Sequence, residues 1–131
     1  MIVQSRVEEY LIDLGISYQE IAKDAWLIED EEKGLPKMVV SVTDPIVIIR
    51  ANVMPIPEKN REALFELLLS LNARDFLHGA YAIDGNDIIA LDTLEYQNMD
   101  RNEFSASLEA MAFALSQHYP KLSMFAQKGE E

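Results

Sequence analysis

Apolar residues recur at three- and four-residue intervals in three parts of the chain, and this spacing predicts three helices. Two of the helix starts have the spacing of a capping box, Ser5 with Glu8 and Asp100 with Glu103. Pro120 is expected to end the third helix, because proline has no N–H to continue the hydrogen-bond ladder. The predicted helices are residues 5–14, 58–72 and 101–117.

The second predicted helix is apolar around much of its circumference. A surface helix needs an apolar band only about 100° wide, and here leucines fall outside any single band. We therefore expect this helix to be covered on more than one side. Its apolar residues are Leu64, Phe65, Leu67, Leu68, Leu69 and Leu71.

Between the first two helices, β-branched and aromatic residues predict short strands. A strand at about residues 25–28 is followed by an acidic turn, and strands at 38–43 and 46–53 form a hairpin about Asp44-Pro45. This hairpin has one fully apolar face and one mixed face, so one side belongs to a core. The apolar face holds Val40, Val42, Val47 and Ile49, and the mixed face holds Val39, Ser41, Ile46, Ile48 and Arg50.

A second hairpin is predicted at residues 79–94 by the two-residue turn Gly85-Asn86, because both residues tolerate positive φ. Both faces of this hairpin are apolar, whereas one face of an antiparallel hairpin normally meets solvent. We expect either that helices cover both faces or that a second subunit covers one. The expected pairs are Ile83 with Ile88, Tyr81 with Ala90, Ala82 with Ile89 and Ala80 with Leu91.

The charge of the chain narrows the classes of partner. Its 131 residues include 23 acidic and 11 basic side chains, which gives a formal net charge of −12 at pH 7. Such an excess repels nucleic-acid backbones and anionic membrane surfaces, so we expect neither as a partner. The absence of cysteine excludes disulfides, thiol nucleophiles and zinc–thiolate sites.

The length of the chain and the distribution of its apolar residues indicate its domain organisation and location. The length predicts a single domain over residues 1–127 with a polar tail at 128–131. The first ten residues carry charges where a signal peptide has its apolar run. The longest wholly apolar stretch, Ile46 to Ile49, is far shorter than the ~18 residues of a membrane span. A cytoplasmic location is expected.

Specific catalytic chemistry is scarce in this sequence. His78 and His118 have no metal-ligand spacing, and we expect a structural role for both. Carboxylates gather in the second hairpin, from Asp84 to Glu95, but their order departs from that of a calcium-binding EF-hand loop. No phosphate-binding glycine loop or Gly-x-Ser-x-Gly motif occurs. We expect no catalytic residue and no cofactor; the alternative is a metal- or small-ligand-dependent enzyme that uses the hairpin carboxylates.

The predicted order of elements, α-β-β-β-α-β-β-α, resembles the type III secretion chaperone-like fold, and in particular the bacterial YbjN family of sensory transduction regulators. The similarity is greatest over Leu67–Asn72, at Phe76 and over Gly79–Asp84, where a helix ending in Leu-Asn leads to a glycine-started hairpin. The final alanine-rich helix ends at Tyr119-Pro120. This resemblance implies an α+β fold with a curved antiparallel sheet packed with helices, no catalysis and a homodimer.

The resemblance also implies where partners bind. In the secretion chaperones the second helix and nearby strands form the dimer contact, and a client polypeptide covers apolar patches of the first helix and the sheet. We therefore expect a non-enzymatic interaction protein, a YbjN-like regulator or a chaperone-like homodimer, that binds another polypeptide. The candidates for the dimer contact are Leu64, Leu68 and Leu71, and those for the client-facing strands are Val39, Ile46 and Ile48.

Overall fold

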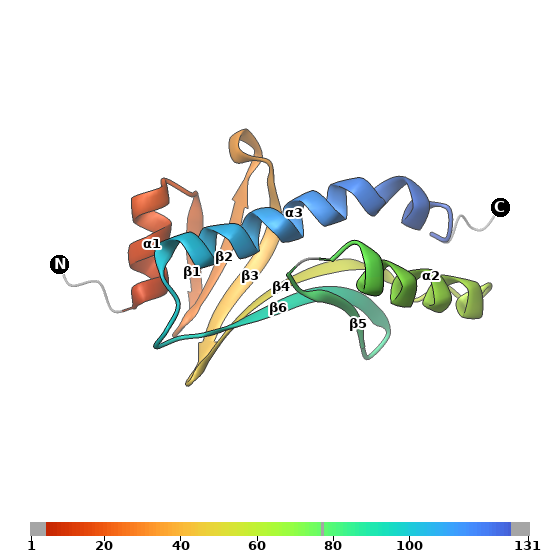
Figure 1. The fold of residues 1–131 in the computed structure, drawn as a ribbon, viewed down its shortest axis with the longest axis horizontal. Coiled ribbons are helices and arrows are strands. Elements are labelled where there is room, and N and C mark those ends of the chain that lie inside the picture. The colour runs from red at the N-terminus through yellow and green to blue at the C-terminus, as the bar shows by residue number, and fades with distance from the viewer. Residues whose placement is uncertain (1–4, 77, 127–131) are drawn as a thin grey trace.

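The computed structural model describes residues 5–76 and 78–126, which form three α-helices and a six-stranded antiparallel sheet (Figure 1). The expected polar tail at 128–131 lies outside the described residues. The helices are α1 (Arg6–Leu14), α2 (Arg61–Arg74) and α3 (Arg101–Ser123), with a short 3-10 turn, η1 (Glu31–Lys33). The strands are β1 (Tyr18–Ala22), β2 (Ala25–Asp30), β3 (Leu35–Thr43), β4 (Ile46–Pro55), β5 (Ala80–Asp84) and β6 (Asp87–Glu95). No described helix combines the length and hydrophobicity that crossing a membrane requires.

The strands lie in the order β1-β2-β3-β4-β6-β5, so that hairpins from the two halves of the chain meet where β4 pairs with β6. Both predicted hairpins form in the predicted register. In the first, Val40 pairs with Ile49 and Val42 with Val47. In the second, all four expected pairs are present. The predicted α+β class with an antiparallel sheet and helices is confirmed.

The core lies on one face of the sheet. Alternate residues of the strands point to this face and are buried against all three helices, as the period of two in a strand requires. Figure 1 shows α3 running along the sheet, with α1 near one end of it and α2 near the other. The buried strand residues of this face include Trp26, Ile28, Met38, Val40, Val47, Ile49, Tyr81, Ile88 and Ala90.

The start of α1 differs from the sequence prediction in its hydrogen bonds. Ser5 caps the helix by accepting the Val7 N–H at 3.0 Å, and Gly15 ends it at φ 69°, in the left-handed region. The predicted return bond from Glu8 is absent because its carboxylate accepts the Tyr18 hydroxyl, 3.0 Å away, instead. The prediction of a Ser5–Glu8 capping box is therefore wrong, although the predicted helix is present.

The end of α3 is also different from the prediction. The helix continues through Pro120 to Ser123, where the sequence predicted its end at residue 117. Proline removes one N–H bond, but the carbonyl it leaves free belongs to an exposed residue and can bind water. Buried Leu122 then holds the last turn on the core. At the other end, the predicted capping box of Asp100 and Glu103 is present with both bonds formed.

The sequence prediction missed β1, which forms one edge of the sheet. Four of its five residues are exposed, so its sequence lacks the apolar alternation of a half-buried strand. Asp30, at the end of β2, fixes the start of β1 by accepting the Ser17 N–H at 3.0 Å. That hydrogen bond, reinforced by the backbone and charge of Lys33, holds the pKa of the Asp30 carboxyl below its ordinary value.

This shift predicts a pH-dependent contribution of Asp30 to stability. Because the pKa is lower in the folded state, the carboxylate stabilises the fold above the unfolded pKa, and this contribution disappears as the pH falls through the folded value. We expect Asp30→Ala to lower the urea midpoint at neutral pH, with the difference from wild type shrinking as the pH falls through the lowered pKa of Asp30. Glu31→Gln, on the neighbouring exposed turn, is the control. A difference that grows in acid would contradict this assignment.

Candidate interaction surfaces

The second face of the sheet carries none of the three described helices and is nonetheless rich in aliphatic side chains. Val39, Ile46 and Ile48, the predicted client-facing residues, all lie on this face and are half-buried. We call it the open sheet face. Its central row runs across four strands, through Leu27, Val39, Arg50 and Leu91.

One ion pair crosses the open sheet face. Arg50 Nη2 and Asp84 Oδ2 are 2.6 Å apart, although their positions lie on β4 and β5 with β6 between them. Ile89 lies on β6, between β4 and β5. Its row of cross-strand neighbours lies between the row of Arg50 and the row of Asp84. The ion pair thus passes over Ile89, which is only 3% exposed without any helix above it. The remaining aliphatic residues of this face have no such cover.

A second apolar surface lies where α2 meets the edge strand β5. Leu69 is 68% exposed and Ile83 is 53% exposed, and half-buried Phe65 lies between the two elements. We call these three residues the α2–β5 patch. They border a shallow cavity of about 310 Å³, which is almost wholly apolar. Its other lining residues are Leu68, Asn72, Tyr81 and Ala82.

The predicted dimer residues do not lie on this patch. Leu64 and Leu71 have no exposed surface and Leu68 has 5%, because the side of α2 that bears them packs on the sheet. Side chains that are already buried in one subunit have almost no area to contribute to a dimer contact. The burial of these three residues therefore does not favour them as a dimer contact, whereas the α2–β5 patch has exposed apolar area.

Asn72 joins α2 to the free edge of β5. Its Oδ1 accepts the Tyr81 N–H at 2.7 Å, and its Nδ2 donates to the Tyr81 carbonyl at 3.2 Å. A side-chain amide thereby satisfies the backbone of an edge strand that has no neighbouring strand on that side within the described part of the chain. The preceding loop approaches β6 closely: at Gly79, with φ 98°, a Cβ would lie 2.7 Å from the Leu91 carbonyl oxygen.

Three of the four carboxylates of the second hairpin, all except Asp87, bond to separate partners. Asp84 pairs with Arg50, as described above, and Asp92 accepts the Ser107 hydroxyl of α3. Glu95 accepts the side-chain amide of Asn98 at 2.6 Å. Across the residues that the structure describes, no three His, Cys, Asp or Glu side chains converge as metal ligands would. These contacts give the alternative, metal-dependent function no support.

The two histidines occupy different environments. His78 is exposed in the loop before β5. His118 is 2% exposed and bonded on both ring nitrogens, to Tyr81 and to Asp75. A structural role, as predicted, fits the contacts of His118. His118 lies within α3, which continues to Ser123, and its imidazole is buried.

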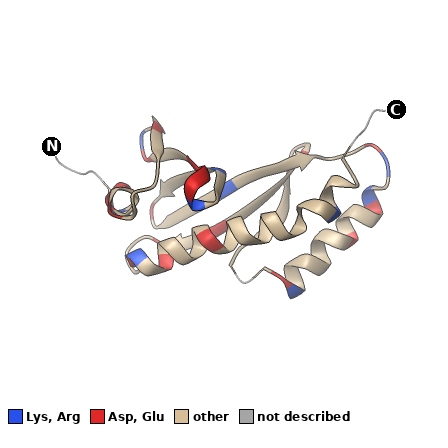
Figure 2. Ribbon diagram, turned by 90° about the horizontal axis from the view of Figure 1, so that it is seen from above, with Lys and Arg blue, Asp and Glu red and all other residues tan. Residues whose placement is uncertain are grey.

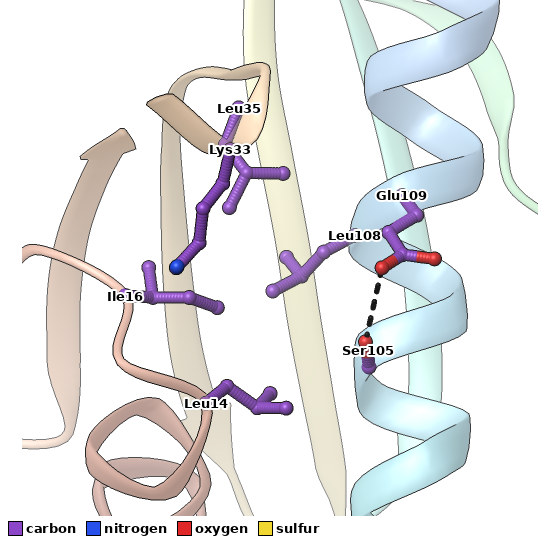
Figure 3. A pocket seen from close by; sticks show the side chains of 7 residues that line it. All are labelled: Leu14, Ile16, Lys33, Leu35, Ser105, Leu108 and Glu109. Carbon is purple, nitrogen blue, oxygen red and sulfur yellow. Dashed lines mark hydrogen bonds between the residues drawn. The ribbon is translucent and has the colours of Figure 1, made fainter. Parts of the chain in front are cut away.

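A small pocket of about 100 Å³ lies between the end of α1, the η1 turn and α3 (Figure 3). Leucine and isoleucine side chains form most of its wall, and the Lys33 amine extends toward Ile16. Across the pocket, Glu109 accepts the Ser105 hydroxyl at 3.4 Å. The pocket is small, and its polar wall consists of Lys33 together with the bonded pair Ser105 and Glu109.

The CesT_Tir_1 family model matches residues 2–128 of the chain. A search of curated proteins finds no significant match. Among solved structures, YbjN from E. coli, described as a transcription regulator, has a TM-score of 0.64 at 15% identity, covering 88% of this chain and 90% of that one. The type III secretion complex ExoU-SpcU of Pseudomonas aeruginosa gives 0.71 at 12% identity, covering 87% and 95%. The ExsC-ExsE complex gives 0.58 at 9% identity, covering 98% and 99%.

At these identities the structural similarity establishes the fold alone. Together with the family match, it confirms the resemblance to YbjN and the type III secretion chaperone-like fold that the sequence indicated.

The contrast between Leu64 and Leu69 can be tested by matched substitutions on one helix. We expect Leu64→Ala to lower the free energy of unfolding by about 2–5 kcal/mol, because it leaves a cavity in the core. Leu69→Ala should change it by about 0.5 kcal/mol or less, since that side chain is mostly in solvent. Urea denaturation measures both. Equal losses would contradict the placement of α2 on the sheet.

Proposed function

The chain belongs to the CesT_Tir_1 family, and from this premise we propose that it is a non-enzymatic, chaperone-like protein that binds a partner polypeptide. The observation that carries the proposal is the open sheet face, where half-buried aliphatic side chains lie on a surface that none of the described helices covers. Contiguous exposed apolar surface is characteristic of sites that bind another protein. Partner binding of this kind serves a secretion chaperone and a YbjN-like regulator alike.

The relatives of similar fold support this proposal in one further way. Two of them, ExoU-SpcU and ExsC-ExsE, were determined as complexes of two different proteins. We extend to this chain only the general property of binding another polypeptide, and we assign that property to Val39, Ile46 and Ile48. Because these residues lie on two adjacent strands in register, a partner that covers one of them is in reach of all three.

The charge of the chain indicates the chemistry of the partner. Acidic positions occur on all three helices and on the η1 turn (Figure 2), and Glu95 is the cross-strand neighbour of Ile46. A partner segment with aliphatic residues and flanking lysines or arginines matches this combination of apolar surface and negative charge. We place this activity in the cytoplasm, where the charge of −12 keeps a protein with exposed apolar surface in solution.

We further propose that the protein is a homodimer that joins through the α2–β5 patch. Leu69 and Ile83 are large, exposed and adjacent to an apolar cavity, which a second copy can fill. The patch is on the helix face of the sheet and at its β5 edge, so a dimer formed there leaves the open sheet face free for the partner polypeptide.

The partner site can be tested by photo-cross-linking in the cell that makes the protein. A photoreactive amino acid at position 46 or 48 should give adducts with another polypeptide, whereas one at exposed Gln117 on α3 should not. Ile48→Glu should reduce the adduct formed from position 46 by at least about tenfold, because a charge is then buried under the partner. Adducts that form equally at position 117 would contradict the assignment of this face.

The dimer can be tested by sedimentation equilibrium. We expect a wild-type mass of twice 14.9 kDa and a dissociation constant at least about tenfold higher for Leu69→Glu, because two copies would bring like charges together. Glu66→Gln, a neighbouring exposed position on α2, serves as the control. A wild-type monomer at high concentration would exclude the homodimer and leave the partner site to its own test.

A further inference from the structure

Hydrogen bonds near the end of α2 form a closed ring through three elements of the fold. Asn72 of α2 holds the backbone of Tyr81 on β5, as described above. The Tyr81 hydroxyl is 2.7 Å from Nδ1 of His118 on α3. The Nε2 of His118 is 3.1 Å from Oδ2 of Asp75. Asp75 directly follows the last residue of α2, so the backbone from Asn72 to Asp75 closes the ring. We call Asn72, Asp75, Tyr81 and His118 the α2 ring.

The chemistry of the ring determines where its protons lie. An ionised Asp75 carboxylate can only accept, so Nε2 of His118 carries a proton. Burial, with a smaller effect of the Asp75 charge, holds the pKa of Tyr81 far above its ordinary value, so the hydroxyl stays protonated. With the single proton of a neutral imidazole on Nε2, Nδ1 of His118 is left to accept the Tyr81 O–H. Every polar side-chain atom at these two contacts has a partner in this single tautomer.

The surroundings of Tyr81 and His118 restrict water and alternative partners, whereas Asp75 is partly exposed at the surface. His118 and Tyr81 are 2% and 5% exposed, and the Phe76 ring packs edge-on against both, at centroid distances of 6.0 and 4.9 Å. In such surroundings a buried polar group that loses its partner is costly, so the ring favours one arrangement of α2, β5 and α3.

The α2–β5 patch lies directly beside this ring. Leu69 is three residues before Asn72 on α2, and Ile83 is two residues after Tyr81 on β5. Asn72 and Tyr81 also line the cavity that the patch borders. The distance between the two halves of the patch therefore depends on the bonds that hold α2 to β5.

We propose that the α2 ring is a built-in clasp that fixes α2 against β5 and so gives the α2–β5 patch the shape in which it binds a second copy. The part that concerns a second copy rests on the proposed homodimer. His118 and Asp75 act in it as positioning residues: neither belongs to the patch, and both act through Tyr81.

The tautomer of His118 is the first test, because a purely space-filling histidine would not be restricted to one form. In the ¹⁵N spectrum of the wild-type protein near neutral pH, we expect His118 to show an unprotonated Nδ1 and a protonated Nε2. Asp75→Ala should convert this signature to a mixture of tautomers, while His78→Gln, the control at the exposed histidine, should leave it unchanged. A mixture in the wild type would overturn the proposed ring.

The second test measures the clasp and the dimer in the same variants. Tyr81→Phe and Asp75→Ala should speed hydrogen exchange of the residue-81 amide, which is bonded to Asn72, by roughly three- to tenfold. The dimer dissociation constant should rise by a similar factor, and His78→Gln should change neither. Unchanged exchange in both folded variants would overturn the clasp. Faster exchange with an unchanged dissociation constant would overturn its link to the patch. If exchange is faster in the variants but the wild-type protein is a monomer, the clasp stands and the proposed homodimer is excluded.

Discussion

The pairing of β4 with β6 is the contact on which the rest of the structure depends. Every other neighbouring pair of strands is a hairpin, formed by residues close in the sequence, whereas β4 and β6 are separated by α2 and β5. Their ladder runs from Ile46 with Glu95 to Pro55 with Asp87. This ladder joins strands β1 to β4 with the β5–β6 hairpin into one sheet, and α3 lies along that sheet. It also fixes the position of α2, which connects β4 to β5, relative to the open sheet face.

The elements with strong local signals could be predicted from the sequence. Both hairpins follow from alternating residues about a short turn, and that alternation also gave the correct register and the correct core face. The edge strand β1 could not be found in this way, because its residues are largely exposed and have no period of two in hydrophobicity. The length of α3 was also beyond local reasoning: buried Leu122, a tertiary contact, outweighs the single bond lost at Pro120.

The candidate surfaces were predictable to a different degree. The division of the first hairpin into an apolar and a mixed face followed from the sequence, and Val39, Ile46 and Ile48 of the mixed face are half-buried on the open sheet face. On α2 the excess of leucine was visible, but the sequence could not tell Leu64, which faces the sheet, from Leu69, which faces away. The α2 ring has no sequence signal, since His118 is 37 positions from Tyr81 and 43 from Asp75. Only the fold brings them together.

The amide of Asn72 has a consequence for assembly. A sheet with two free edges can add strands at both, and copies that join edge to edge at both ends grow into a fibre. Asn72 occupies the N–H and carbonyl of Tyr81 in the middle of the β5 edge, so another strand cannot pair continuously there. Copies that meet at this edge must do so through side chains, and continuous strand addition is confined to β1. A single side chain of α2 thereby closes one end of the sheet to strand addition, so edge-to-edge growth at both ends is not open to this fold.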